Sequence, residues 1–368
     1  MDNKKIRAIG ALLLVVVWAL LTAFSWFGPE NAFSVSERRE LAKMPEISIK
    51  NILDGKFMPD FEDYTLDQFP LRDSFRTLKS LFHLYVMNQG DNNDIYITDG
   101  VAAKQEYPLN GASVEYATNR FTALYEKFLK ENGSEVFVTV VPDKGYYLAE
   151  ESGHLAMDYE AMFDAVQAGM PYATYIDLTD TLEIGDYYRT DTHWRQEHLM
   201  ETAERICRMM GITAPKAEDY TLETVEKPFY GVYYGQAALP MEPETICYLQ
   251  SELLKACKVY NHESGSYGEV YDMTKLSSRD LYDIFLSGAR SLLTIENPNA
   301  ATDKELIVVR DSFGSSIVPL LVQDYAKVTL VDIRYIRLDT LDKFMTFNGQ
   351  DVLFLYSTLV LNNSSTIK

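Results

Sequence analysis

The sequence contains little of what metal and redox sites are usually built from. It has three cysteines and five histidines in 368 residues. Cys207, Cys247 and Cys257 show no metal-ligand spacing, and of these only Cys247 and Cys257 could form a disulfide. His193 and His198 are five residues apart, so they would not share one face of a helix. We therefore expect no catalytic metal ion, and the sequence indicates no cofactor.

Two further absences limit the kinds of ligand. No glycine-rich phosphate loop follows a predicted strand, which disfavours nucleotide binding. Basic residues are outnumbered by acidic ones, 34 to 54, and the formal net charge of -20 argues against nucleic acid as a partner. Apolar residues are plentiful, at 47%, and suffice for the core of one large domain or two.

The first 27 residues predict a membrane anchor. Positive charges at Lys4, Lys5 and Arg7 accompany an apolar run from Ile6 to Phe27, which is about long enough to span a bilayer. Because positive charge stays inside, the N-terminus would be cytoplasmic and the rest extracytoplasmic, in a single-pass protein of the cell membrane. The alternative is a cleaved signal peptide and a secreted protein, which the bulky aromatic residues at the end of the run disfavour.

Residues 28–56 are polar and irregular, and we interpret them as a stalk. Residues 57–85 predict two helices that break at Phe69-Pro70, because the residue before proline avoids the helical region. The second helix carries an apolar stripe at helical spacing, which predicts packing against a core. The stripe consists of Leu71, Phe75, Leu78, Phe82 and Tyr85.

From residue 94 the chain alternates strands and helices. This alternation predicts an α/β fold with a mostly parallel sheet and helices on both faces. It lapses between about 212 and 300, which we interpret as a mixed insertion within a domain spanning 57–368. The expected strands are 94–98, 135–141, 173–178, 306–309, 328–332 and 352–356, and the expected helices 115–131, 159–168 and 195–210.

A serine after one of these strands is the first candidate for chemistry. The β-branched run Ile307–Val309 predicts a buried strand, and a turn with Ser312 and Gly314 follows it. A helix is expected over 317–325, with Pro319 in its first turn. A strand-to-helix turn exposes a hydroxyl and offers backbone N–H groups to an oxyanion, so Ser312 is the candidate nucleophile.

An aspartate and a histidine two residues apart supply the candidate base. In an extended segment Asp191 and His193 would project to the same side, so the carboxylate could fix the imidazole tautomer for a serine nucleophile. The alternative is a surface loop in which the histidine caps another group. Spacing alone leaves both possibilities open.

Four other side chains are secondary candidates for substrate binding or support of the site. Lys144 follows a strand, at the sheet end where sites form, although a turn lysine can also be simply solvated. Arg310 could hold an acidic sugar or pair with Asp311. Arg189 and Trp194 flank the predicted base, and Trp194 either packs the loop or faces a sugar.

The segment YYRTDTHW, from Tyr187, resembles the signature of the DHHW family of extracytoplasmic bacterial proteins. That family is related to the alginate O-acetyltransferases of the SGNH-hydrolase superfamily. Other segments over residues 34–360 add to the resemblance: SERRELAKMP from Ser36, FEDYTLDQFPLRDSF from Phe61, VVPDKGYY from Val140, IVVRDSFGSSIVPLL from Ile307 and VTLVDIRYI from Val328.

The resemblance implies an SGNH-hydrolase-like, flavodoxin-like fold and a catalytic triad. Carried over by motif, Ser312 is the nucleophile, His193 the general base and then acid, and Asp191 the residue that orients it. The implied activity is acetyl transfer to, or removal from, a cell-surface polysaccharide. Transferases of this kind often receive acetyl groups from a membrane-bound O-acyltransferase, which is therefore an expected partner.

The sequence departs from the family pattern at two places. Thr192 stands between the aspartate and the histidine where the family name has histidine. Ser287-Gly288-Ala289 stands where the family tends toward Gly-Gly-Asn, so an oxyanion-hole donor is missing unless backbone N–H groups near Ser312 and Gly314 serve. Three functions follow: acetyl transfer or hydrolysis, a non-catalytic polysaccharide-binding or assembly subunit, and hydrolysis of a lipid or peptide ester.

Overall fold

The computed structural model describes residues 3–34 and 36–368, so the first two residues of the predicted anchor lie outside it. The chain forms two compact units. One contains the chain up to Asn92 together with Tyr234–Pro240, and the other contains Asn93–Tyr233 and Met241–Lys368. The α/β unit therefore begins at Asn93, and the helices expected to open the 57–368 domain belong to the N-terminal unit.

The N-terminal unit begins with α1 (Asn3–Phe27), whose segment Lys4–Trp26 is long and apolar enough to cross a membrane. The expected helix pair is α3 (Phe57–Asp67) and α4 (Arg72–Leu81), and the break at Phe69-Pro70 is confirmed. A π-helical turn, Phe82–Val86, extends α4. The shorter elements are β1 (Phe33–Ser34), β2 (Arg39–Glu40) and α2 (Ile49–Leu53).

The prediction that the apolar stripe of α4 packs in a core is wrong. All five of its side chains are exposed. The side of the helix that faces inward carries polar groups, among them Ser80, which is buried. Periodicity gave the position of the apolar face correctly, but it could not tell what covers that face.

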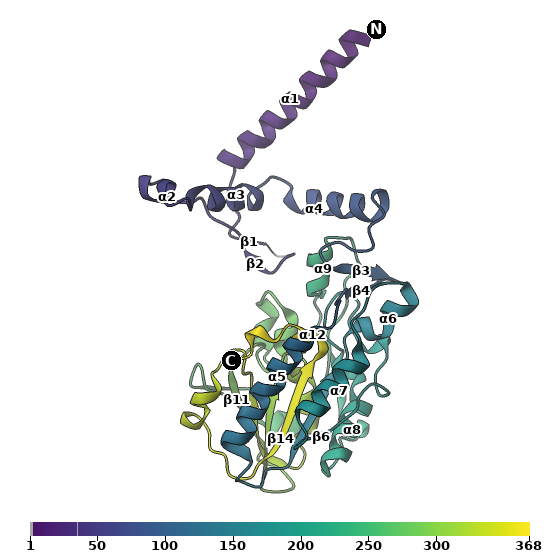
Figure 1. Cartoon of the computed structure of the whole chain (residues 1–368), viewed down its shortest axis with the longest axis vertical. Coiled ribbons are helices and arrows are strands. Elements are labelled where there is room, and N and C mark those ends of the chain that lie inside the picture. Colours follow the sequence, from purple (N-terminus) through teal and green to yellow (C-terminus); the bar gives the residue numbers. More distant parts are fainter. Residues whose placement is uncertain (1–2, 35) are drawn as a thin grey trace. The chain divides into compact units, whose positions relative to one another are not determined.

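A central sheet of eight strands organises the α/β unit (Figure 1). The strand order is β10-β9-β11-β13-β12-β14-β5-β6, and the pairs from β13 to β6 are all parallel. β11 pairs antiparallel with both β13 and β9, and β10 pairs antiparallel with β9. The parallel strands are β5 (Val136–Val141), β6 (Thr174–Tyr175), β12 (Lys304–Arg310), β13 (Tyr325–Val331) and β14 (Asp351–Ser357).

The central strands are buried on both faces. Their apolar runs do not alternate with polar residues, so each strand can pack against a core on either side of the sheet. Val136, Val138 and Val140 of β5 join one core, and Phe137 and Val141 join the other. Helices α5 (Gly111–Leu124), α7 (Tyr159–Gly169) and α12 (Thr358–Asn362) cover the first core, and α8 (Met200–Met210) the second. The predicted α/β fold, with a mostly parallel sheet between helices, is confirmed.

The predicted insertion at 212–300 is part of the same sheet. Its strands β9 (Lys258–Asn261), β10 (Ser266–Gly268) and β11 (Leu292–Glu296) extend the sheet on its antiparallel side. The strands β7 (Thr221–Thr224) and β8 (Cys247–Gln250) form a separate antiparallel pair, and α10 (Glu252–Ala256) follows. All three cysteines are free thiols, so the structure has no Cys247–Cys257 disulfide.

Two local predictions differ from the structure. The sequence allows Lys144 to be a turn residue, but α6 (Lys144–Ser152) begins at this position, capped by the Asp143 side chain. The helix expected at 317–325 begins earlier, as α11 (Gly314–Ile317), and continues as a 3-10 helix over Val318–Leu321. Pro319 has no N–H for an α-helical hydrogen bond, which accounts for the change to the 3-10 form.

Candidate active site

The serine turn, Asp311–Ser315, follows β12 directly. Asp311 holds the turn: one carboxylate oxygen accepts the Phe313 backbone N–H at 3.0 Å. The other oxygen accepts both the backbone N–H and the hydroxyl of Ser357, at 2.8 and 2.7 Å. Ser357 ends β14, the neighbouring strand, so the turn is fixed to two adjacent strands of the sheet. Ser312 remains partly exposed at its apex.

The base loop, Tyr187–Trp194, is closed by an antiparallel bridge between its two ends. Within it, Asp191 Oδ1 accepts the His193 backbone N–H at 3.1 Å and lies 2.6 Å from His193 Nδ1. On the other side of the ring, His193 Nε2 lies 2.8 Å from the hydroxyl of Ser312, 119 residues further along the chain. The three side chains predicted to form a triad therefore lie in one hydrogen-bonded line.

Aromatic rings hold the imidazole in place. Tyr282 stacks on His193 with ring centroids 3.9 Å apart and planes 9° apart, and Phe313 approaches at 5.1 Å. The Tyr282 hydroxyl lies 2.7 Å from the hydroxyl of Ser316, so the stacking ring is itself fixed to the segment after the nucleophile. Burial raises the pKa of Tyr282, which keeps this phenol neutral. His193 consequently has little freedom to rotate away from Ser312.

The clamp segment, Phe229–Tyr233, comes from the mixed insertion and grips the base loop. Val232 donates its backbone N–H to Asp191 Oδ2 at 2.7 Å, and Tyr233 donates its own to the Thr190 carbonyl at 3.0 Å. The backbones of the clamp segment and the base loop approach so closely that a Cβ atom on Gly231 would lie 2.2 Å from the Thr190 carbonyl oxygen. Only glycine fits at this position without moving backbone.

Glu244 completes the support of the base loop. This buried carboxylate accepts the backbone N–H groups of Arg189 and Thr190, at 2.8 and 2.7 Å, and the Thr190 hydroxyl at 2.7 Å. Hydrogen bonds to an ionised acceptor are stronger than neutral ones, and here three converge on one side chain. Asp191 therefore sits in a loop whose backbone is fixed from both sides.

Lys144 is buried beneath the same loop, with 2% of its surface exposed. Its ammonium donates to the backbone carbonyls of Tyr188, at 2.9 Å, and Arg189, at 3.4 Å, and lies 4.9 Å from the centre of the Tyr233 ring. Burial lowers the pKa of Lys144 to about 7, against the attraction of Asp191 and two other carboxylates. Lys144 is therefore a support of the base loop and is neither solvated nor placed to touch a substrate.

Replacing Lys144 with methionine is expected to change how stability depends on pH. With a pKa of 10.5 unfolded and about 7 folded, the wild-type loses up to about 5 kcal/mol of unfolding free energy as pH falls from 10.5 to 7. Lys144→Met removes this loss of stability. As pH rises from 7 to 10, the melting temperature of the wild-type should therefore increase relative to that of the variant. Lys227→Met, at an exposed lysine bonded to the Leu276 carbonyl, is the control. Parallel melting curves for wild-type and Lys144→Met would contradict the titration.

Most of the other candidate residues pack against the serine turn and support it. Trp194 is buried, and its indole N–H donates to the Ser316 hydroxyl at 2.8 Å, so this ring packs the serine turn and faces no sugar. Arg310 is buried as well and donates to the Ser315 hydroxyl at 3.0 Å and to the Asp311 carbonyl at 3.1 Å, a position that favours support of the serine turn over contact with an acidic sugar. Gly314 leaves room for the Arg310 side chain, which a Cβ would meet at 2.9 Å. Arg189 alone has a half-exposed side chain, 3.7 Å from Glu244.

Backbone N–H groups near the nucleophile differ in their availability to an oxyanion. The Gly314 N–H donates to the Asp311 carbonyl at 3.2 Å and the Phe313 N–H to the Asp311 carboxylate, so both are occupied. The Ser312 N–H donates to no acceptor in the described part of the chain. Ala289, where the family tends toward asparagine, brings no side-chain donor. The Ser312 N–H is therefore the available donor on the serine turn.

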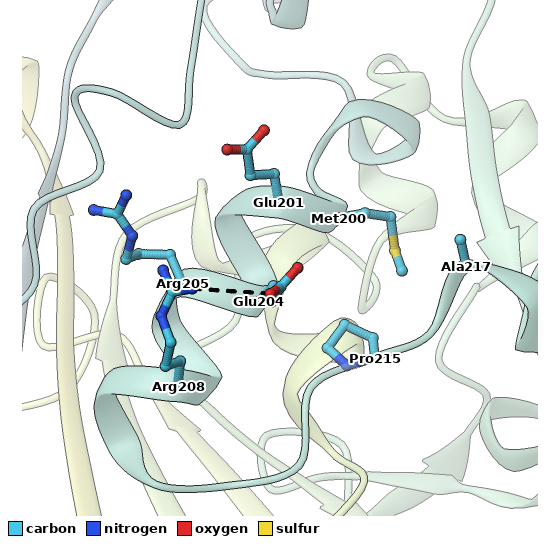
Figure 2. A pocket seen from close by; sticks show the side chains of 7 residues that line it. All are labelled: Met200, Glu201, Glu204, Arg205, Arg208, Pro215 and Ala217. Carbon is cyan, nitrogen blue, oxygen red and sulfur yellow. Dashed lines mark ion pairs between the residues drawn. The ribbon is translucent and has the colours of Figure 1, made fainter.

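A hollow of about 330 Å³ lies along the outer side of α8 (Figure 2). Its lining carries both signs of charge, and Arg208 pairs with Glu204 across one turn of the helix at 3.9 Å. None of the lining residues belongs to the base loop or the serine turn. This hollow is therefore separate from the Asp191–His193–Ser312 line.

Three of the residues that build the site were not singled out by the sequence: Gly231, Glu244 and Tyr282. Each is a common residue type outside the longer helices and strands, with no neighbouring motif. The sequence offered one signal for them. The strand-helix alternation lapses between 212 and 300, which marks this segment as different from the helices that cover the sheet.

The base loop and the serine turn both fall within residues 169–331, which match a family model described as DHHW protein. A DHHW family protein from Eubacterium siraeum is similar in structure at 21% identity, with a TM-score of 0.59 over 75% of this chain and 95% of that one. Bacillus cereus PatB1 is similar at 21% identity, with a TM-score of 0.61 over 73% and 96%.

A second PatB1 structure, with a sulfonyl adduct, has a TM-score of 0.58. The O-acetyltransferase domain of Pseudomonas putida AlgJ matches at 13% identity and a TM-score of 0.44, over 73% of this chain and 92% of that one. A comparison with curated proteins gives no match. At 21% identity, the DHHW family protein and the two PatB1 structures establish a shared fold. Residues 169–331, with the whole base loop and serine turn, match the family model described as DHHW protein, in agreement with the resemblance seen around His193.

Proposed function

We propose that this protein is an extracytoplasmic serine acyl-transfer enzyme that adds acetyl groups to a cell-surface polysaccharide, or removes them. The observation that carries the proposal is the line of two hydrogen-bonding contacts from Asp191 through His193 to Ser312. A serine hydroxyl is a weak nucleophile unless a base lies within hydrogen-bonding reach, and an oriented histidine is the usual base.

In the first half of the reaction, Ser312 Oγ attacks the carbonyl carbon of an acetyl ester while His193 Nε2 takes the hydroxyl proton. Asp191 stabilises the resulting imidazolium through Nδ1. The Ser312 N–H donates to the oxyanion of the tetrahedral intermediate. The intermediate then collapses, the proton on Nε2 passes to the departing alcohol oxygen, and acetyl-Ser312 remains.

In the second half, a hydroxyl group attacks acetyl-Ser312. His193 takes the proton from that hydroxyl and returns it to Ser312 Oγ as the ester bond breaks. If the hydroxyl belongs to a sugar the reaction is a transfer, and if it belongs to water the reaction is a hydrolysis. Both use the same residues and differ in whether water is kept from the acetyl-enzyme.

The acceptor and donor follow from the protein's location and relatives. The apolar helix α1 suits a single-pass anchor with its N-terminus in the cytoplasm, which leaves the α/β unit outside the cell membrane. The segment around His193 resembles a family related to O-acetyltransferases, and acetyl transfer outside the cytoplasm needs an acetyl donor on that side of the membrane. A cell-surface polysaccharide and a membrane-bound O-acyltransferase are the proposed partners.

Covalent labelling of the full-length protein tests the proposal. The protein is incubated with 4-nitrophenyl acetate or, given the PatB1 sulfonyl adduct, with a sulfonyl fluoride, and the modified residue is located by peptide mass. We expect the label on Ser312, and no label there in Ser312→Ala or His193→Ala. Ser315→Ala is the matched control, since Ser315 lies in the same turn but bonds to Arg310. Equal slow release of nitrophenol by all four proteins, with no adduct, would show that Ser312 is not the nucleophile for this donor.

A second function is favoured by one observation, the missing donor at Ala289. In that case the protein would be a non-catalytic polysaccharide-binding or assembly subunit on the same fold. Such a subunit should retain polysaccharide binding and its role in the cell when Ser312 is replaced with alanine. An enzyme should keep binding but lose acetyl transfer, so a binding assay beside an acetylation assay separates the two. Hydrolysis of lipid or peptide esters by the same triad would appear in a substrate panel.

A further inference from the structure

The N-terminal unit turns its apolar side chains outward. On α4 and its π-helical extension, Leu71, Phe75, Leu78, Phe82 and Tyr85 lie on one face at helical spacing, and each is between 42% and 78% exposed. Neighbouring helices of the same unit expose more of the same kind, including Ile49 and Leu53 of α2 and Met58 and Leu66 of α3. Apolar surface of this extent rarely faces water.

The opposite face of α4 is polar and forms the contacts within the unit. Arg76 donates to the Gly235 carbonyl at 2.6 Å, and Arg72 forms an ion pair with Glu37. One turn further on, the buried Ser80 hydroxyl accepts from Asn92 at 2.8 Å. The helix is therefore inverted relative to a helix on a water-soluble domain, where the apolar face packs inward and the polar face meets solvent.

The chain also fixes these helices close to the end of the span. Gln68, at the C-terminal end of α3, accepts the Asn31 backbone N–H at 2.8 Å and donates to the Asn31 carbonyl at 3.0 Å. Asn31 follows Phe27, the last residue of α1, by four residues, which can extend over at most roughly 14 Å. The junction between α3 and α4 is thereby held within that distance, plus the length of one glutamine side chain, of the end of α1.

We infer that the outward apolar faces of α2, α3 and α4 lie in the outer surface of the membrane that α1 crosses. An apolar helix face parallel to the bilayer plane enters the boundary between headgroups and acyl chains. The occupant is the lipid bilayer itself, because the surface is continuous with the span through the Asn31–Gln68 contact. This inference rests on the proposed membrane anchor and is independent of the proposed chemistry at Ser312.

The contact should be apolar in origin. Two of the basic residues on α4, Arg72 and Arg76, form ion pairs with Glu37 on the inward side of the helix. The exposed lysines, Lys50, Lys56 and Lys79, stand among exposed acidic residues that offset their charge, namely Asp54, Asp60 and Asp73. The lipid contact should therefore depend little on acidic headgroups and should persist at high salt.

A fluorescent label on the full-length protein, reconstituted in phosphatidylcholine vesicles, tests the inference. An environment-sensitive dye is attached at Leu78→Cys or Val86→Cys, with the partly exposed Cys247 replaced by serine to remove background. The control site is Phe344→Cys, a half-exposed aromatic position in the α/β unit. We expect spin-labelled lipid to quench the dye at 78 and 86 and aqueous iodide to quench the dye at 344.

Each other outcome overturns the inference in a recognisable way. Equal quenching by iodide at 78 and 344, in protein that floats with the vesicles, leaves the anchor and rejects the lipid contact. Failure to float rejects the anchor and the lipid contact together. Shielding from iodide without lipid quenching, lost when the protein is diluted in lipid, means that a second copy covers the face. Ser312 labelling in the same samples reports on the proposed chemistry separately.

Discussion

Replacing Asp191 with asparagine is expected to lower kcat about 10⁴-fold while leaving the protein folded. In the base loop and the clamp segment, the Asp191 carboxylate accepts from N–H groups at both ends: Oδ1 faces His193 N and Nδ1, and Oδ2 faces Val232 N. An asparagine has one acceptor oxygen and one donor nitrogen, so it cannot satisfy both ends. If its oxygen stays with Val232, its NH₂ group faces Nδ1 and favours the tautomer that protonates Nε2, which then cannot act as a base.

The measurement is the rate of acetyl transfer or of 4-nitrophenyl acetate hydrolysis, beside the melting temperature. A matched control exists on the same chain, since Asp186 lies 3.0 Å from His198 Nδ1 in a second Asp–His pair, at the surface. Asp186→Asn removes the same kind of contact without touching the line to Ser312, and its rate should stay within a factor of two or so. A comparable loss in both variants would mean that the Asp191 effect comes from general destabilisation.

Replacing Gly231 with alanine is expected to reduce kcat at least about 100-fold, which makes it the second largest effect. The added Cβ would lie 2.2 Å from the Thr190 carbonyl oxygen and 2.3 Å from the Asp191 nitrogen. Both neighbours are backbone atoms, so the clamp segment or the base loop must move. Either movement stretches the 2.7 Å bond from Val232 to Asp191 and misaligns His193.

Gly268 provides the control, because it lies in the same insertion and the nearest atom to its added Cβ would be 4.0 Å away. Gly268→Ala should leave the rate unchanged. For Gly231→Ala we expect the loss in kcat and little change in KM, since the clamp segment positions the base and the proposal gives it no contact with substrate. Full activity in Gly231→Ala would show that the insertion does not set the position of Asp191.

The strands of the sheet and the motif residues could be predicted from the sequence because local patterns specify them. Runs such as Val136–Val141 and Ile307–Val309 are apolar without alternation, which is typical of parallel strands covered on both faces. The sequence pairs Asp191 with His193 correctly but for the wrong reason, because the segment is bent and not extended. The Asp191 carboxylate accepts the His193 backbone N–H across the bend, and this turn brings the two side chains together. The distance from His193 to Ser312 lay beyond any local pattern, and the family resemblance supplied that pairing.

What could not be predicted depends on long-range contacts. Glu244 is one acidic residue among 54 Asp and Glu, and Gly231 one glycine among 19; only the folded backbone shows why either is needed. The sequence left Lys144 as either a residue of the site or a solvated turn lysine; it is buried, because α6 begins there and carries it under the base loop. The position of the apolar stripe on α4 was predicted correctly, but its surroundings were not. The sequence pattern of an apolar helix face is the same whether the face packs against protein or against lipid.

The position of β14 in the sheet has a consequence for incomplete chains. This strand comes last in the strand order along the chain, yet it lies between β12 and β5 and, in the part of the chain that the structure describes, it alone joins those two strands. Its final residue, Ser357, also bonds to the aspartate that holds the serine turn. A polypeptide released by the ribosome before residue 351 would therefore have an unjoined sheet and an unsupported nucleophile. Prematurely terminated products should therefore be unable to act at Ser312 and should be readily degraded.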